Sequence, residues 1–272
     1  MRQKQNVCII CPVIGPRFKC FYQAPKNYDA YIFTNNPEIK PAIEKAGWNY
    51  VFIDIPLSDN FAVSSLQSKY VKFLQFLKDE KFSDFKKYDR VICTDHKLRI
   101  KDRHIKRMLE IQSKPILIRD HPKKRKNIWE EIGQSMFQER YLSVIQETID
   151  YVREKIKSGC DAGCGRHKIC TTGLVSYEVG NGKVHEFLDE LYRDIIKLGT
   201  SQCQIVWFMV AQKYADIIQV IGWDDLDISW RDPAMVKWTI FPILKIRYKE
   251  NKTIWRLFGI IPVFQGRPKN HA

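Results

Sequence analysis

The sequence predicts an α/β fold with a mixed, mainly parallel β-sheet flanked by helices, and three observations support this fold class. Short apolar runs rich in β-branched residues alternate with segments of helical periodicity, which is the βαβ pattern of a doubly wound sheet. Polar residues follow several of these runs directly, as they do where the carboxyl ends of strands hold a ligand. The length of 272 residues is ample for one large domain with an appendage.

The first three predicted strands are apolar runs near the N-terminus. They span Asn6 to Val13, Asp29 to Thr34 and Asn49 to Ile55, and a helix is predicted from Pro37 to Ala46. The sequence has no GxGxxG after the first strand and no GxxxxGK[ST]. Their absence disfavours a dinucleotide-binding Rossmann enzyme and a P-loop NTPase.

Residues Ser64 to Leu77 predict an amphipathic helix, because apolar side chains recur at helical spacing after a serine start. Lys69 and Lys72 are interleaved with these apolar residues. Two interpretations stay open for the two lysines. They lie on the solvated face of the helix, or they bind phosphate as point charges.

The basic stretch from Lys86 to Ile100 contains a predicted buried strand, Val91 to Thr94, which ends directly on Asp95. Ligands of open α/β sheets collect beyond the carboxyl ends of the strands, so Asp95 is a candidate for holding a metal or a diphosphate. The alternative is that Asp95 only caps the following turn. A basic helix is predicted next, from Arg103 to Ile111.

A neighbouring strand is predicted from Pro115 to Arg119, and it ends on Asp120 and His121. Two strands that end on an acid followed by a histidine indicate a shared site at one edge of the sheet. We therefore expect His121 and Arg125 to line the same cleft as Asp95.

The second half of the chain predicts further helices and a strand. One long helix is expected over residues 134–158, with Phe137, Tyr141 and Val152 on its core face. The elements expected after it are a strand over residues 171–179, a helix over 184–198 and a buried helix within 200–214.

The loop that precedes the last predicted strand contains Cys160, Cys164, His167 and Cys170. These residue types bind zinc, but their spacing matches neither a CxxC pair nor a zinc finger. The spacing therefore disfavours a zinc site.

The chain carries 45 lysines and arginines against 31 acidic residues, a formal net charge of +14. This surplus predicts an anionic partner, which could be nucleic acid, anionic lipid or a phosphorylated substrate. The eight cysteines follow no signal peptide, so we expect a reduced, cytoplasmic chain. No window of eighteen apolar residues predicts a membrane span.

The order of the motifs resembles that of compact GT-A-type glycosyltransferases, in particular the families that include plant pollen-turgor and mucilage transferases and bacterial surface-polysaccharide enzymes. The resemblance covers residues 6–222 and is carried by YIFTNN at the second strand, a lysine-bearing helix, YDRVICTDHK, and DHPKKRKNIWEE. It implies a GT-A-like fold and transfer of a sugar from a nucleotide-sugar donor, a UDP-sugar, to a surface polysaccharide or lipid-linked glycan.

The resemblance also assigns site residues. Asp95 would face the donor diphosphate directly or through Mn²⁺ or Mg²⁺, although Lys97 stands where a second carboxylate is usual. The candidate catalytic residues are Asp120, His121 and Glu131. The other candidate donor-binding residues are Pro12, Lys69, Lys72, Lys97, Arg125, Gly173 and Gln204. Cys203 replaces the acid that relatives carry beside this glutamine, so no catalytic base is assigned.

Residues 233–272 are predicted to form a basic, aromatic extension of a glycosyltransferase domain that spans residues 1–232. Two blocks, each led by a tryptophan and followed by basic residues, begin at Trp238 and Trp255. They are typical of attachment to an anionic membrane, here the inner face, and the alternative is a β-hairpin or a dimer contact. A nucleic-acid-binding protein without enzymatic activity is the second functional hypothesis, and it is disfavoured because no binding motif accompanies the charge.

Overall fold

The computed structural model describes residues 5–16, 21–228, 244–249, 252–257 and 261–266. The chain divides into two compact units, residues 1–230 and 231–272. The domain boundary predicted at residue 232 lies outside the described residues, as does Trp238, the residue that leads the first block of the tail.

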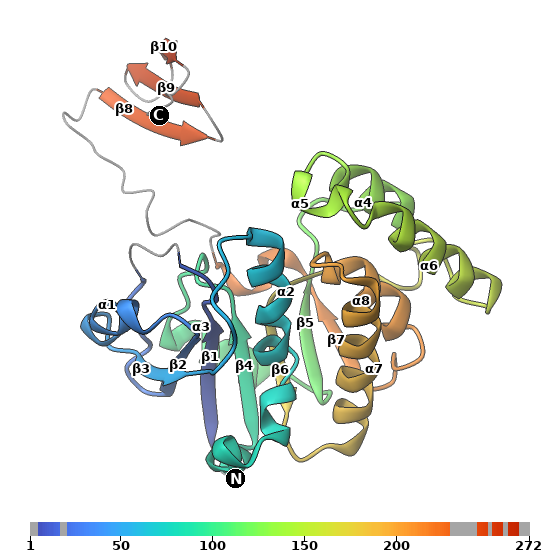
Figure 1. The fold of residues 1–272 in the computed structure, drawn as a ribbon, viewed down its shortest axis with the longest axis horizontal. Helices are drawn as coiled ribbons and strands as arrows, with labels where there is room; N and C mark the ends of the chain where they lie inside the picture. Colours follow the sequence, from blue (N-terminus) through green and yellow to red (C-terminus); the bar gives the residue numbers. More distant parts are fainter. Residues whose placement is uncertain (1–4, 17–20, 229–243, 250–251, 258–260, 267–272) are drawn as a thin grey trace. The chain divides into compact units, whose positions relative to one another are not determined.

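The first unit is built on a seven-stranded sheet with the order β3-β2-β1-β4-β6-β5-β7 (Figure 1). Its strands are β1 (Val7–Pro12), β2 (Asp29–Thr34), β3 (Asn49–Phe52), β4 (Arg90–Thr94), β5 (Ile116–Asp120), β6 (Cys170–Glu178) and β7 (Ile218–Ile221). The predicted α/β class with a mixed, mainly parallel sheet is confirmed. Only β6 runs antiparallel to its neighbours in this sheet, between β4 and β5.

Helices cover both faces of the sheet, which explains why β1 and β4 are buried at every position and do not alternate in polarity. Val71 of α2, Phe187 of α7 and Val206 of α8 pack on one face, and Ile43 of α1 and Ile105 of α3 pack on the other. The helices are α1 (Lys40–Lys45), α2 (Phe61–Lys72), α3 (Asp102–Ile111), α4 (Ile128–Ser135), α5 (Glu139–Leu142), α6 (Ile145–Lys157), α7 (Gly182–Leu198) and α8 (Cys203–Ala211). Short 3-10 helices are η1 (Pro37–Ile39), η2 (Gln75–Lys78), η3 (Glu80–Lys87) and η4 (Trp223–Leu226).

The helix predicted from Ser64 to Leu77 is placed differently by the structure. It begins three residues earlier, at Phe61, because the Asn60 side chain accepts hydrogen bonds from the backbone N–H groups of Ala62 and Val63. It ends at Lys72, and Leu74 adopts a left-handed backbone conformation with φ of 53°. Residues 73–77 are all buried, and one helix face could not bury five consecutive residues, so the chain changes direction there.

The prediction of a single long helix over residues 134–158 is wrong. The chain forms the end of α4, then α5 and α6, with turns between them. Tyr141 and Val152 are buried as expected, but Phe137 is 84% exposed. The turns between the short helices direct Phe137 away from the core. The spacing of apolar residues in the sequence is compatible with short helices as well as with one straight helix, so periodicity alone cannot distinguish the two.

The second unit contains a three-stranded antiparallel sheet with the order β10-β9-β8. Its strands are β8 (Leu244–Lys249), β9 (Lys252–Leu257) and β10 (Ile261–Gly266). The β8–β9 pair agrees with the hairpin that was the alternative interpretation of the tail. Membrane attachment through this segment stays a prediction. Among the described residues, no helix combines the length and apolarity needed to cross a bilayer.

Candidate active site

A cavity of about 570 Å³ lies at the edge of the sheet where β1, β4 and β5 end. Its volume is in the range of small-molecule sites. The residues predicted from the sequence that line it are Pro12, Lys69, Lys72, Asp95, Lys97, His121, Arg125, Glu131, Gly173 and Gln204. Asp120 is the predicted site residue that does not line it, and its carboxylate instead accepts a hydrogen bond from the His121 backbone at 2.7 Å. The functional roles of these residues stay predictions.

The sheet brings Asp95 and His121 to the same cavity because β4 and β5 run in the same direction. The strand between them, β6, is antiparallel to both. The Asp95 backbone N–H donates to Gly173 O at 2.8 Å, and the His121 N–H donates at 3.0 Å to Ile169 O, directly before β6. The expectation that His121 and Arg125 share a cleft with Asp95 is therefore confirmed.

Lys72 and Asp95 form an ion pair on the cavity wall. Lys72 Nζ donates to Asp95 Oδ1 at 3.2 Å, and the two side chains are 6% and 29% exposed. Burial opposes charging of both groups, but the pairing outweighs it. The Asp95 carboxylate raises the pKa of Lys72, and the two lysine ammonium groups, Lys72 foremost, lower the pKa of Asp95. Both groups are therefore charged at neutral pH.

Lys69 lies one helical turn before Lys72 and is also buried, with 5% of its surface exposed. It has no hydrogen bond or ion pair from its side chain to any described residue, although it lines the cavity. Burial lowers the pKa of Lys69, and the neighbouring Lys72 adds to this effect. Of the two interpretations that the sequence left open for Lys69 and Lys72, the solvated face is wrong.

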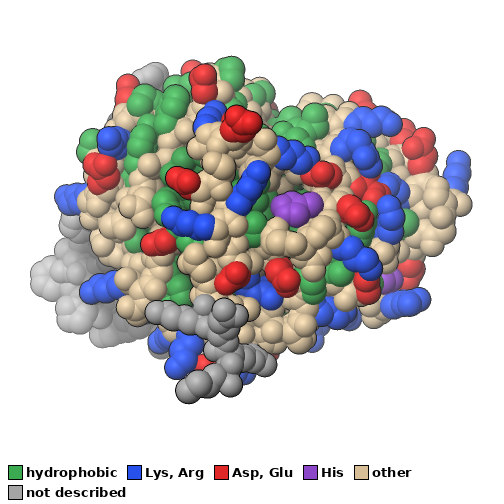
Figure 2. Space-filling model, turned by 90° about the horizontal axis from the view of Figure 1, so that it is seen from below, with side chains coloured by type: hydrophobic (Ala, Val, Ile, Leu, Met, Phe, Trp, Pro, Cys, Tyr) green, Lys and Arg blue, Asp and Glu red, His purple; other side chains and the backbone are tan. Residues whose placement is uncertain are grey.

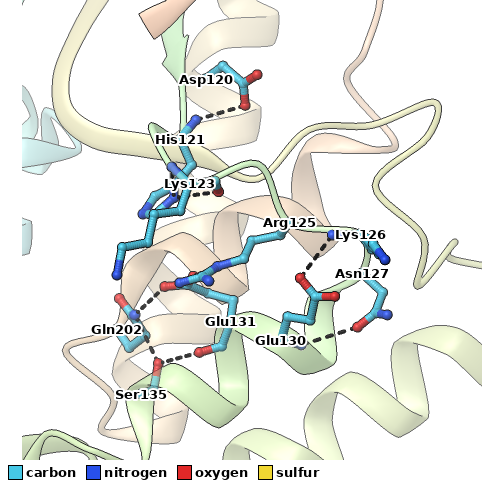
Figure 3. A network of polar contacts seen from close by, with 10 residues as sticks. All are labelled: Asp120, His121, Lys123, Arg125, Lys126, Asn127, Glu130, Glu131, Ser135 and Gln202. Carbon is cyan, nitrogen blue, oxygen red and sulfur yellow. Dashed lines mark hydrogen bonds and ion pairs between the residues drawn. The ribbon is translucent and has the colours of Figure 1, made fainter.

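Arg125 and Glu131 form a second ion pair beside the cavity (Figure 3). Arg125 Nε donates to Glu131 Oε2 at 3.0 Å, and the side chains are 13% and 6% exposed. The other Glu131 oxygen accepts from Gln202 Nε2 at 3.1 Å, and Gln202 also donates to Ser135 Oγ at 3.0 Å. With both oxygens engaged, Glu131 holds Arg125 in place, and the catalytic role that the resemblance implies for Glu131 stays a prediction.

His121 is held by the loop that follows β5 rather than by a carboxylate. Its Nδ1 lies 2.9 Å from Lys123 O and 3.1 Å from Lys123 N, as Figure 3 shows. Because the imidazole is fixed by backbone atoms, it can present its other nitrogen to a ligand.

Sequence reasoning missed several residues that line the cavity. Gln202, two positions before the predicted Gln204, makes the buried contacts with Glu131 and Ser135. Ser201 Oγ is buried beside it and has no partner among the described residues. These residues precede α8 in an irregular segment, where no periodicity marks them. The available signal was the polar triplet Thr200 to Gln202 directly before an apolar helix.

Cys203, the first residue of α8, is 4% exposed and lines the cavity. Its Sγ lies 3.1 Å from Thr172 Oγ1. Burial would raise the pKa of the thiol, but the ammonium groups of Lys69 and Lys72 outweigh it and lower the pKa. Of the seven cysteines among the described residues, the other six have raised pKa values, so Cys203 is the most readily ionised thiol of this set.

The donor set at Asp95 does not fit a divalent cation. Within the described ranges, no group of three or more histidine, cysteine, aspartate or glutamate side chains could hold a metal ion. The loop from Cys160 to Cys170 is among the described residues and contains no such group either. Mg²⁺ and Mn²⁺ prefer carboxylate and other oxygen ligands, whereas Asp95 is paired with an ammonium group.

No family model matches the chain, and no curated protein sequence matches it. Among solved structures, the chain is similar to mouse xyloside xylosyltransferase 1 in its apo form, with a TM-score of 0.41 and 10% sequence identity. The match covers 80% of this chain and 84% of that chain. A likeness of this degree assigns neither a donor nor an acceptor.

Proposed function

We propose that this chain is a glycosyltransferase that moves a sugar from a nucleotide-sugar donor, a UDP-sugar, to a glycan or lipid-linked acceptor. The observation that carries the proposal is Lys69, a buried ammonium group that lines the cavity and forms no hydrogen bond or ion pair with any described residue. A buried charge without a partner is costly, and an anionic ligand would supply the missing counter-charge.

The cavity favours a nucleoside diphosphate over a smaller anion. Its volume of about 570 Å³ exceeds what inorganic phosphate would fill, and its wall mixes the two lysines with apolar residues such as Ile14 and Tyr141. The position beyond the carboxyl ends of parallel strands is the usual ligand site of open α/β sheets. The resemblance of the ordered motifs to GT-A-type enzymes supports the same ligand class.

In this proposal the two lysines of α2 bind the donor diphosphate and stabilise the charge that develops on the leaving group as the glycosidic bond breaks. Arg125, held by Glu131, adds a guanidinium that can fork onto phosphate oxygens. His121 lies at the same wall and is placed to contact the sugar or the acceptor.

The nucleic-acid hypothesis is less well supported. On the face shown in Figure 2, lysine and arginine side chains are interspersed with aspartates and glutamates and form no continuous basic surface. Lys69 and Lys72 are buried in a cavity wall, where the phosphates of a duplex could not reach them.

Isothermal titration with UDP and a panel of sugar nucleotides tests the proposal. We expect Lys69→Met to weaken UDP binding by about 10- to 100-fold, the effect of losing a hydrogen bond to a charged group worth about 1.5–3 kcal/mol. Lys106→Met on α3 is the matched control, because Lys106 is exposed and does not line the cavity. This variant should bind UDP with the affinity of the wild type.

The same titrations at increasing pH provide a second readout. Because the pKa of free Lys69 is lowered by burial and a bound phosphate favours its charged form, wild-type affinity should fall as pH rises through that lowered pKa. The decline in UDP affinity should begin at a pH below the ordinary pKa range of lysine, and it should be weaker in Lys69→Met. Failure of every sugar nucleotide and of UDP to bind would reject the proposed function.

Alkylation of Cys203 gives an independent test of the ligand position. Iodoacetamide should modify Cys203 through the cavity, since the neighbouring lysines favour its thiolate. Added UDP should slow this reaction and leave the alkylation rate of Cys160, which lies outside the cavity, unchanged. Peptide mass spectrometry measures both rates in one sample. Equal rates at Cys203 with and without UDP would contradict a ligand beside Lys69 and Lys72.

A further inference from the structure

Lys72 fills the place at Asp95 where the resemblance would put a divalent cation. Its Nζ is 3.2 Å from Asp95 Oδ1, and its side chain is 94% buried because only 6% is exposed. A metal ion that took Asp95 Oδ1 would displace this ammonium group and leave it buried without its counter-ion. Breaking a largely buried ion pair in this way destabilises the protein, because it leaves one charge without its counter-ion.

The charge of the cavity also opposes a metal. Three lysines line the cavity, Lys69, Lys72 and Lys97, and the negative charge that opposes them is that of Asp95, because Glu131 is already paired with Arg125. This leaves a surplus of two positive charges before Lys123 and Arg140 are counted. A divalent cation would enter a cavity that is already positive, whereas the doubly negative diphosphate bridge of a sugar nucleotide matches it.

We infer that the donor diphosphate is neutralised by Lys72 and Lys69 in place of a divalent cation, and that Asp95 is a positioning residue that holds Lys72 charged and oriented. The inference rests on the proposed function and makes it specific. Lys72 is the last residue of α2, and its backbone is fixed by the helix while Asp95 fixes its tip. The cation is thus preorganised before the donor arrives, which is the condition for effective charge stabilisation.

Titration of UDP into the full chain in EDTA, in Mg²⁺ and in Mn²⁺ tests the inference. We expect the three dissociation constants to agree within about threefold, a difference of less than 1 kcal/mol. Binding of Mn²⁺ to the protein with UDP present, followed by electron paramagnetic resonance, should not exceed its binding to UDP alone. Binding that tightens more than about tenfold with Mn²⁺ would overturn the inference.

Asp95→Asn separates a positioning residue from a metal ligand. A positioning role predicts that UDP binding weakens by the same factor in EDTA and in Mn²⁺. It also predicts that the alkaline loss of UDP binding moves to lower pH, because Lys72 loses the carboxylate that raises its pKa. A metal ligand would instead lose only the Mn²⁺-dependent part of the affinity. If UDP binds in none of these conditions, the proposed function fails, whereas binding that requires a metal overturns only this inference.

Discussion

Replacing Lys72 with methionine is expected to lower kcat/KM for sugar transfer by about two to three orders of magnitude, the loss seen when one preorganised charge-stabilising group is removed. The ammonium group is buried and aimed at the cavity by Asp95, so water cannot substitute for it. The substitution also leaves Asp95 with a negative charge where the diphosphate would lie. Release of UDP from the donor identified in the sugar-nucleotide screen measures the effect.

The double variant Lys72→Met, Asp95→Asn separates chemistry from stability. Lys72→Met alone should lower the free energy of unfolding by about 2–3 kcal/mol, below the range for fully buried pairs because Asp95 is 29% exposed. The double variant removes both charges, so its stability should recover while its turnover stays low. Recovery of turnover in the double variant, or full activity of Lys72→Met, would contradict the role given to Lys72.

Replacing Arg125 with methionine is expected to destabilise the fold by about 3–5 kcal/mol, because it leaves the buried Glu131 carboxylate without its counter-ion. Among the described residues, only Gln202 would remain to donate to that carboxylate from its side chain. Urea unfolding followed by tryptophan fluorescence measures the change. Lys124→Met, at the exposed neighbouring position, is the control and should change stability by no more than about 0.5 kcal/mol.

The double variant Arg125→Met, Glu131→Gln tests whether Glu131 acts mainly as the ion-pair partner of Arg125. A neutral amide at position 131 does not need the guanidinium, so most of the lost stability should return. A Glu131 that served mainly as a catalytic acid or base would instead make Glu131→Gln inactive at unchanged stability, with Arg125→Met no less stable than the wild type.

Much of the fold could be predicted because the strands carry their own signal. β1, β2 and β4 are short apolar runs, and the structure places them within one residue of the predicted bounds at each end. The direction of β6 could not be predicted. A strand buried on both faces has the same composition whether it runs parallel or antiparallel, and its direction depends on chain connections that local pattern does not encode.

The sequence predicted many of the residues that line the candidate site, but it did not predict which of them interact with one another. Asp95 was singled out by its position after a strand, but its partner Lys72 lies 23 residues earlier in sequence, on a helix whose rotation relative to the sheet is set by tertiary packing. Lys69 and Lys72 share a face by helical spacing, and that spacing does not say whether the face meets solvent or a cavity. Gln202 was missed in favour of Gln204 for the same reason, since the start of α8 fixes which side chain turns inward.

The antiparallel strand β6 acts as a spacer that fixes the width of the cavity. It separates the ends of β4 and β5 by two interstrand steps, about 9.6 Å from the spacing of paired strands, and so sets the gap between the Asp95 and His121 walls. Backbone hydrogen bonds hold this gap, and side-chain substitutions cannot alter it. Under the proposed function, substitutions of the side chains at the rim of the cavity would change which sugar it accepts, whereas the span available to the diphosphate and the sugar together would stay constant.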